Sequence, residues 1–254
     1  MYPDLFGIDN FSYALMIAIG VATSIFWLIY YFKRRGYSRN AIIDLVAITL
    51  LTVAIGIVGA ILFQNVYDLI KDPQNYKFNF SMTFYGGLIV GTIAFIALFF
   101  LIVRKRDNVP FQEVAIVAPI CITSAHAFGR IGCFLAGCCY GKHTDSCIGV
   151  DFPNLGRRIP TQLIESIFLF ILTIVLFFLI FKIGFKYTLH TYLASYSIFR
   201  FIIEFFRGDD GRGATLLGMY PSQLVCIFIW IIFVPTLLIL RKYAFNKPLE
   251  NDKE

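Results

Sequence analysis

Residues 11–32 read FSYALMIAIGVATSIFWLIYYF, an apolar stretch without a charged side chain. A helix of about 20 apolar residues is long enough to cross the hydrocarbon core of a bilayer. The stretch lacks the small-residue cleavage pattern of a secretion signal, so we expect it to be retained. It therefore predicts a first transmembrane helix and identifies the chain as a membrane protein.

The composition extends this prediction to the whole chain. Of its 254 residues, 58% are hydrophobic and the mean hydropathy is +0.74, whereas soluble domains are about 45–50% apolar. The apolar runs are long and do not alternate, which favours helices over a β-barrel. The fold class predicted is an all-α, polytopic membrane protein: one domain over 1–254, with a short extracytoplasmic arm near 142–159.

The distribution of basic residues predicts the orientation. Seven spans are expected, with cations following the first, third, fifth and seventh, as in Lys33–Arg35 and Arg104–Arg106. Positive loops face the cytoplasm, so the N-terminus should lie outside and the C-terminus inside. The net charge of +6 is explained by this signal, and no nucleic-acid partner is expected. The predicted spans are 11–32, 41–64, 82–103, 111–129, 160–183, 187–206 and 219–240.

A glycine-rich stretch follows the fourth span: residues 129–141 read GRIGCFLAGCCYG. Gly129, Gly132 and Gly141 allow a ligand to approach the backbone closely, and Arg130 offers a permanent charge with a forked donor set suited to phosphate. A buried arginine costs at least about 2.5–3.5 kcal/mol on insertion scales, which favours an anionic lipid headgroup as its partner. A tight helix-packing motif is the alternative.

A second charged cluster lies on one predicted helix face. Arg200, Glu204 and Arg207 are spaced i, i+4 and i+7, and Tyr196 lies one turn earlier. Charges on one stripe of a membrane helix usually face a cavity. Glu204 can hold both arginines and leave positive charge for a ligand. The alternative is an internally satisfied pair that only fixes helix packing.

Two similar segments, Pro160-Thr161-Gln162 and Pro221-Ser222-Gln223, begin the fifth and seventh spans. Helix capping explains the proline and hydroxyl residues. It explains Gln162 and Gln223 less well, and these amides can instead bond a headgroup or an incoming peptide.

Two tyrosines near span ends, Tyr13 and Tyr85, are most simply membrane-interface anchors when each is taken alone. Potential metal ligands also gather at the end of the glycine stretch and just beyond it, at Cys138, Cys139, His143 and Cys147. Thiolates and imidazole bind zinc, but this spacing matches no familiar zinc pattern. We therefore expect a disulfide or free thiols, and no metal.

Taken together, these segments resemble the bacterial prolipoprotein diacylglyceryl transferase family. The resemblance rests on Tyr13 with Leu15 and Met16, on Met82–Leu88, on residues 129–141, on Pro160–Glu165 and on Phe199–Arg207. It implies a seven-helix protein of the bacterial plasma (inner) membrane that uses no cofactor. Its activity would be transfer of a diacylglyceryl group from phosphatidylglycerol to the lipobox cysteine of a preprolipoprotein, releasing glycerol phosphate.

The resemblance also implies roles for individual residues. Arg130 and Arg200 would bind phosphate, Glu204 would orient Arg200, and Arg207 would lie nearer the outer interface. Tyr13 and Tyr85 would position lipid or relay a proton. The remaining substrate-binding candidates are Gly129, Gly132, Cys133, Gly141, Gln162 and Gln223.

The chain departs from the family pattern at several polar positions. Cys133 and Ala136 stand where the family has asparagine, and Cys138 stands where it has glutamate. Tyr85 replaces a frequent histidine, and Val58 falls near a family arginine. These changes leave open a divergent transferase in which Cys138 or Cys139 has its own role, a paralogue with another acceptor, or a non-catalytic lipid-binding protein. A transporter is disfavoured because no inverted repeat is visible.

Overall fold

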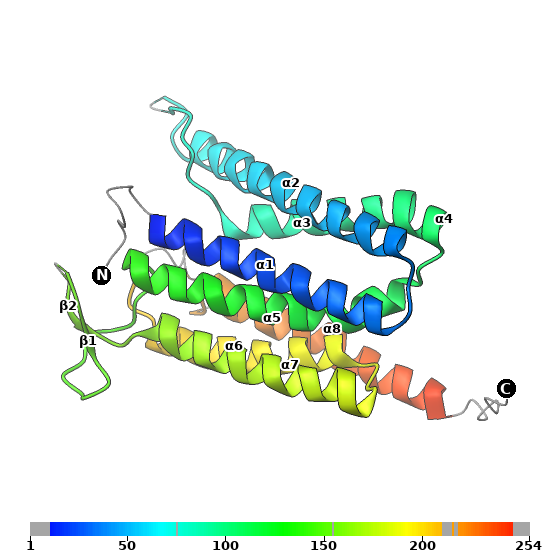
Figure 1. Ribbon diagram of the computed structural model, residues 1–254. Coiled ribbons are helices and arrows are strands. Elements are labelled where there is room, and N and C mark those ends of the chain that lie inside the picture. Colours follow the sequence, from blue (N-terminus) through cyan, green and yellow to red (C-terminus); the bar gives the residue numbers. More distant parts are fainter. Residues whose placement is uncertain (1–10, 75, 154, 210–214, 216–217, 246–254) are drawn as a thin grey trace, which may run out of the picture. The chain divides into compact units, whose positions relative to one another are not determined.

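The computed structural model describes residues 11–245, apart from 75, 154, 210–214, 216 and 217 (Figure 1). The chain divides into two compact units, residues 25–114 and residues 1–24 with 115–254. Each unit is described by itself. The single transferase domain over 1–254 stays a prediction.

Helices make up most of the described chain, and one short hairpin interrupts them. A π-helical turn, Phe99–Val103, links α3 to α4, a second one, Leu179–Ile183, extends α6, and a 3-10 turn, Glu204–Phe206, extends α7. The helices are α1 (Phe11–Arg34), α2 (Arg39–Lys71), α3 (Phe84–Leu98), α4 (Arg104–Asp107), α5 (Phe111–Ala136), α6 (Thr161–Phe178), α7 (Thr188–Ile203) and α8 (Pro221–Phe245). The strands are β1 (Val150–Phe152) and β2 (Gly156–Arg158).

Five helical segments are long and apolar enough to cross a membrane: Phe11–Arg34, Arg39–Lys71, Tyr85–Asp107, Phe111–Ala136 and Thr161–Ile183. The predicted all-α, multi-pass membrane class is therefore supported. α7 has 16 residues, and the apolar part of α8 is the shorter stretch Pro221–Phe233. The count of seven spans and the orientation stay predictions.

In the unit of residues 25–114, α2 and α3 pack through glycines. A Cβ built on Gly87 would lie 3.2 Å from the carbonyl oxygen of Gly56, and one on Gly59 would lie 2.6 Å from the Cβ of Val90. Small residues let membrane helices approach closely, which strengthens van der Waals packing. In the same unit, the Arg35 guanidinium forms a 2.7 Å ion pair with Glu113 at the start of α5.

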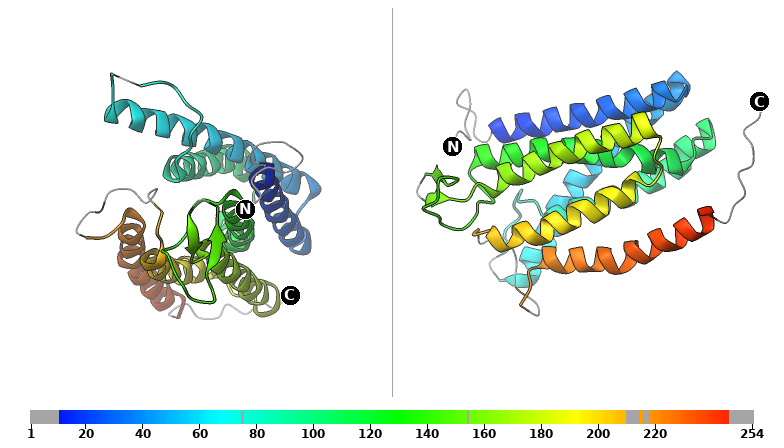
Figure 2. Two further views of the ribbon diagram at one scale, coloured as in Figure 1. Left: turned by 90° about the vertical axis from the view of Figure 1, so that its left-hand side faces the viewer. Right: turned by 90° about the horizontal axis from the view of Figure 1, so that it is seen from below.

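In the other unit, α5, α6, α7 and α8 run side by side (Figures 1 and 2). Hydroxyl and indole groups donate hydrogen bonds between these helices, which is how polar groups stabilise helix association in a membrane. The first part of α1 packs on α5 at Gly20, where a Cβ would lie 2.9 Å from the carbonyl oxygen of Ala125. The interhelical bonds are Ser166 to Ala127 (3.0 Å), Thr173 to Thr123 (2.9 Å), Thr188 to Ile116 (2.8 Å) and Trp230 to Ser197 (2.7 Å).

The predicted arm at 142–159 contains the antiparallel β1–β2 hairpin, in which Val150 pairs with Arg158. It projects from the end of the unit where α5 ends and α6 begins (Figure 2). Gly141 anchors its base: its amide donates to Ile159 (2.8 Å), and a Cβ there would lie 2.6 Å from that carbonyl oxygen. Only glycine fits at this position without displacing the neighbouring backbone. The extracytoplasmic position of the arm stays a prediction.

Candidate functional site

Glu165, in the second turn of α6, is the centre of a buried polar cluster. Its Oε2 lies 3.0 Å from Nε of Arg130 on α5. Its Oε1 accepts a 2.7 Å hydrogen bond from the Tyr196 hydroxyl on α7 and lies 3.7 Å from Nε2 of His126. The Glu165 side chain is only 3% exposed. Three helices therefore converge on one carboxylate, which fixes where the Arg130 guanidinium lies.

A second cluster lies at the end of α7 and just beyond it. The Arg200 guanidinium approaches Glu204 at 2.8 Å, and that of Arg207 approaches the same carboxylate at 3.9 Å. Arg207 also forms a bidentate pair with Asp209, at 2.9 and 2.6 Å. The predicted arrangement, with Glu204 between two arginines, is present. Sequence reasoning missed Asp209, which takes up the charge of Arg207.

The two clusters together balance their charges, because Arg130, Arg200 and Arg207 face Glu165, Glu204 and Asp209. The site therefore carries less surplus positive charge than the sequence predicted. Unused donors are still available, since a guanidinium carries five N–H groups. Nη1 of Arg200 is buried and has no hydrogen-bond partner among the described residues. Such groups are rare and call for an explanation such as a ligand or ordered water.

The glycines of α5 mark where α1 approaches that helix. A Cβ on Gly132 would lie 3.1 Å from the ring of Tyr13, while one on Gly129 would meet only the Ile17 side chain, at 3.7 Å. Gly132 thus has a packing role, as the alternative interpretation proposed. Gly129 is less constrained. The Tyr13 phenol is close enough to Arg130 to interact with it electrostatically.

The two glutamine candidates differ in what they contact. Gln162 is only 1% exposed, and its amide nitrogen donates to the carbonyl oxygen of Cys138. Thr161 donates beside it to the carbonyl oxygen of Cys139 at 2.9 Å. Gln223 accepts a 3.0 Å bond from the amide of Tyr220, just before α8. Gln162 therefore supports the cysteine loop, and Gln223 has the capping contact of the simpler interpretation.

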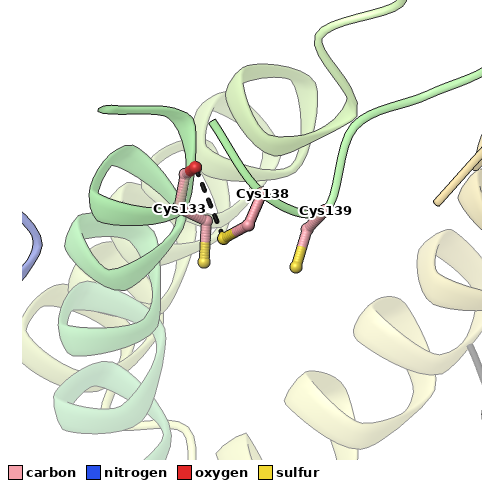
Figure 3. Close-up of side chains that lie close together, drawn as sticks. All are labelled: Cys133, Cys138 and Cys139. Atoms are coloured by element: carbon pink, nitrogen blue, oxygen red, sulfur yellow. Dashed lines mark hydrogen bonds between the residues drawn. The ribbon is translucent and has the colours of Figure 1, made fainter. Parts of the chain in front are cut away.

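The end of α5 brings two cysteines together. The amide of Gly137, which has a φ of 73°, donates to Phe134, and that of Cys138 donates to Cys133. These two bonds are the Schellman motif, in which the residue after the left-handed glycine lies over a residue in the last turn of the helix. Here the residues so paired are Cys138 and Cys133, and the Cys138 thiol also donates to the Cys133 carbonyl oxygen at 3.6 Å (Figure 3).

Cys139 completes a group of three thiols. Its own φ of 61° is left-handed, which is uncommon for a residue with a side chain, and its sulfur faces the same space as the other two (Figure 3). The adjacent Cys133 and Cys138 side chains lower the pKa of Cys139, and the Arg130 and Arg207 guanidinium groups lower it further, against the opposing effect of burial.

Sequence reasoning missed Glu165 and His126 as members of the site. Two signals were available: a glutamate near the start of an apolar helix, and the i, i+4 spacing of His126 and Arg130, which places them on one face. Tyr196 was placed on the face of Arg200, yet it donates to Glu165. Tyr85 belongs to the other unit, in the first turn of α3, and its role stays a prediction.

Comparison with known proteins gives one consistent result. The family model described as prolipoprotein diacylglyceryl transferase matches residues 4–239. A Clostridium tetani protein named phosphatidylglycerol–prolipoprotein diacylglyceryl transferase is 34% identical, over 90% of this chain and 92% of its own length. A Clostridium perfringens protein named as the second transferase of that kind is 35% identical, over 90% of both chains. A Geobacter sulfurreducens protein of the same name is 29% identical over 85% of both chains.

Proposed function

The chain belongs to the prolipoprotein diacylglyceryl transferase family, and from this premise we propose that it transfers a diacylglyceryl group from phosphatidylglycerol to the lipobox cysteine of a preprolipoprotein. The products are a thioether-linked lipoprotein precursor and glycerol phosphate. The observation that carries the proposal is the pair of buried arginine clusters, in which Arg130 and Arg200 are held by Glu165 and Glu204. Buried guanidinium groups with unused donors suit a phosphodiester.

The reaction needs stabilisation of the departing phosphate. The acceptor thiolate attacks the glyceryl carbon, the bond from that carbon to a phosphate oxygen breaks, and its electron pair stays on the oxygen. Fixed cations aimed at this growing charge lower the barrier, because they need no reorganisation as the charge appears. Arg130 and Arg200 would take this role through N–H groups that their carboxylate partners leave free.

The thiol must also lose its proton, since the thiolate is the nucleophile. A tyrosine with a pKa near 10 is poorly matched to a thiol near about 8.5. Tyr13 and Tyr85 are therefore proposed to position lipid, with a proton relay as their second role.

The site would open toward the outer leaflet of the bacterial plasma membrane. The charged loops support seven spans with the N-terminus outside, and in that orientation the β1–β2 hairpin and the cysteine loop are extracytoplasmic. A preprolipoprotein crossing the membrane would then reach the site from the side where its lipobox emerges.

The test uses the full chain in detergent with phosphatidylglycerol labelled in its diacylglyceryl part and a lipobox peptide. We expect the lipidated peptide and free glycerol phosphate in equal amounts, and neither product with a peptide whose cysteine is replaced by serine. Arg200→Ala should abolish both products. Lys142→Ala, an exposed cation in the same unit, is the matched control and should leave turnover unchanged. Retained turnover in Arg200→Ala would contradict the phosphate role.

The altered residues at Cys133 and Cys138 favour a second candidate, a paralogue with another acceptor. Its signature in the same assay is release of glycerol phosphate without modification of the peptide. Binding of phospholipid with neither product would identify a non-catalytic lipid-binding protein and overturn both enzymatic proposals.

A further inference from the structure

The three thiols after α5 have the spacing of a metal site. The Sγ atoms of Cys133, Cys138 and Cys139 all lie within 4.8 Å of one another. A tetrahedral Zn²⁺ with Zn–S bonds of about 2.3 Å places its sulfur ligands about 3.8 Å apart. Small side-chain rotations therefore suffice to bring the sulfurs to bonding distance. The Cys138 side chain is exposed and has room to rotate in this way.

The backbone holds this arrangement independently of any ion. The Schellman motif fixes Cys138 over Cys133, and the left-handed Cys139 turns the third sulfur toward them. The amide of Gln162 and the hydroxyl of Thr161 bond the carbonyl oxygens of the two loop cysteines. Support of this kind around the ligands is what orients a metal site.

Nearby charges suit bound thiolates. Three thiolates around a divalent cation carry a net charge of −1. The Arg130 guanidinium interacts electrostatically with Cys133 and Cys139, and that of Arg207 interacts with Cys139. The sequence grouped Cys138 and Cys139 with His143 and Cys147, but among the described residues the clustered ligand atoms are those of Cys133, Cys138 and Cys139. His143 pairs with Arg158 in a β-bridge.

We propose that Cys133, Cys138 and Cys139 bind one Zn²⁺ ion through their three sulfurs, and that its fourth position takes the thiol of the acceptor peptide. The second half rests on the proposed function. Zinc sites with three protein ligands leave the fourth position for water or substrate, whereas structural sites close it with a fourth protein ligand. This inference revises the expectation that the protein has no metal.

Coordination would activate the acceptor without a matched protein base. A thiol bound to Zn²⁺ is deprotonated, so its proton passes to water as the Zn–S bond forms. The bound sulfur then attacks the glyceryl carbon, the carbon–oxygen bond breaks, and the electron pair leaves on the glycerol phosphate. The product is a neutral thioether, a weaker ligand than a thiolate, which leaves the metal and reopens the position.

The first experiment measures metal content in the full chain, purified in detergent with a reductant and without chelator, then loaded with Zn²⁺ and dialysed. We expect about one zinc per chain. Serine at Cys133, Cys138 or Cys139 should weaken zinc binding more than about 100-fold, because even outer-shell changes cost about 10–100-fold in affinity. Cys147→Ser, an exposed cysteine of the same arm, is the matched control and should bind zinc as the wild type does.

Co²⁺ replacement provides a second readout that does not depend on activity. The intensity of the sulfur-to-cobalt charge-transfer band should correspond to three thiolate ligands in the wild type. In each serine variant it should fall to the intensity of two thiolate ligands. Helical circular dichroism and a single gel-filtration peak establish that each variant is folded.

Three results would overturn the metal site. The first is a protein that retains no zinc and whose three thiols all react with an alkylating reagent. The second is a disulfide bond among these cysteines that persists in place of the metal. The third is equal zinc binding in the wild type and the triple serine variant.

The fourth position is tested by adding the lipobox peptide to the Co²⁺ form. One additional thiolate in the charge-transfer band, absent with the serine peptide, is the expected result. A spectrum that the cysteine peptide does not change would overturn the acceptor role and leave the three-thiolate site standing. Because both readouts are spectroscopic, they stay informative if the transfer reaction itself is not observed.

Discussion

Replacing Glu165 by glutamine separates the structural from the catalytic role of Arg130. The amide keeps the shape of the carboxylate, and its oxygen can still accept from the Tyr196 hydroxyl. It removes the negative charge that lies 3.0 Å from the guanidinium, at a side chain that is 3% exposed. Removing one partner of a buried ion pair costs about 3–5 kcal/mol, because the other charge is left uncompensated.

A second variant removes both charges. In Arg130→Met with Glu165→Gln no buried charge is left unpaired, so the penalty of an uncompensated buried charge is removed. We therefore expect the double variant to regain most of the lost stability. Its transfer activity should stay at least about 100-fold below wild type, the usual cost of removing one preorganised group that stabilises transition-state charge.

Stability is measured as the free energy of unfolding in mixed micelles titrated with a denaturing detergent and followed by circular dichroism. Activity is measured as released glycerol phosphate per folded chain. Wild-type stability of Glu165→Gln would refute the account of a buried pair. Wild-type turnover of the double variant would refute the phosphate role of Arg130 and leave it a packing residue.

Other predictions follow from single contacts. Tyr196→Phe removes a 2.7 Å donor to a carboxylate and should lower the free energy of unfolding by about 1.5–3 kcal/mol, the value of a bond to a charged group. Gly141→Ala should destabilise the protein by about 1–3 kcal/mol, because its Cβ would lie 2.6 Å from a carbonyl oxygen. Gly129→Ala is the control and should fold normally, because its Cβ would lie 3.7 Å from its nearest neighbour. Equal melting curves for the two variants would contradict this prediction. Asp209→Asn breaks the bidentate pair of Arg207 and should tighten phosphatidylglycerol binding while lowering kcat, which equilibrium binding and turnover assays measure separately.

Much of the helical architecture follows from the sequence, because apolar runs and loop charges are local signals. The five segments that meet the length and hydropathy of a membrane span all coincide with predicted spans. The pairing of Arg200 with Glu204 was also predictable, since i, i+4 spacing fixes it within one helix.

The centre of the site was not predictable in the same way, because it depends on contacts between helices. Glu165 meets Arg130 and Tyr196 only when α5, α6 and α7 pack together. The cysteine group depends on where α5 ends. The span was predicted to end at residue 129, but the helix continues to Ala136, which places Cys133 in its last turn. Gly137 was the signal for that end, since glycine is the usual residue of a left-handed helix cap.

The balance of charges in the site has a consequence for its chemistry. Three guanidinium groups face three carboxylates, so the resting site is near neutral and less costly to bury than three free cations. A phosphodiester entering this site would meet oriented N–H donors rather than a net positive field. Its own charge changes little until the carbon–oxygen bond begins to break. Donors held toward that oxygen would then bind the departing phosphate more strongly than the intact lipid, and only such a difference between ground state and transition state accelerates the chemical step.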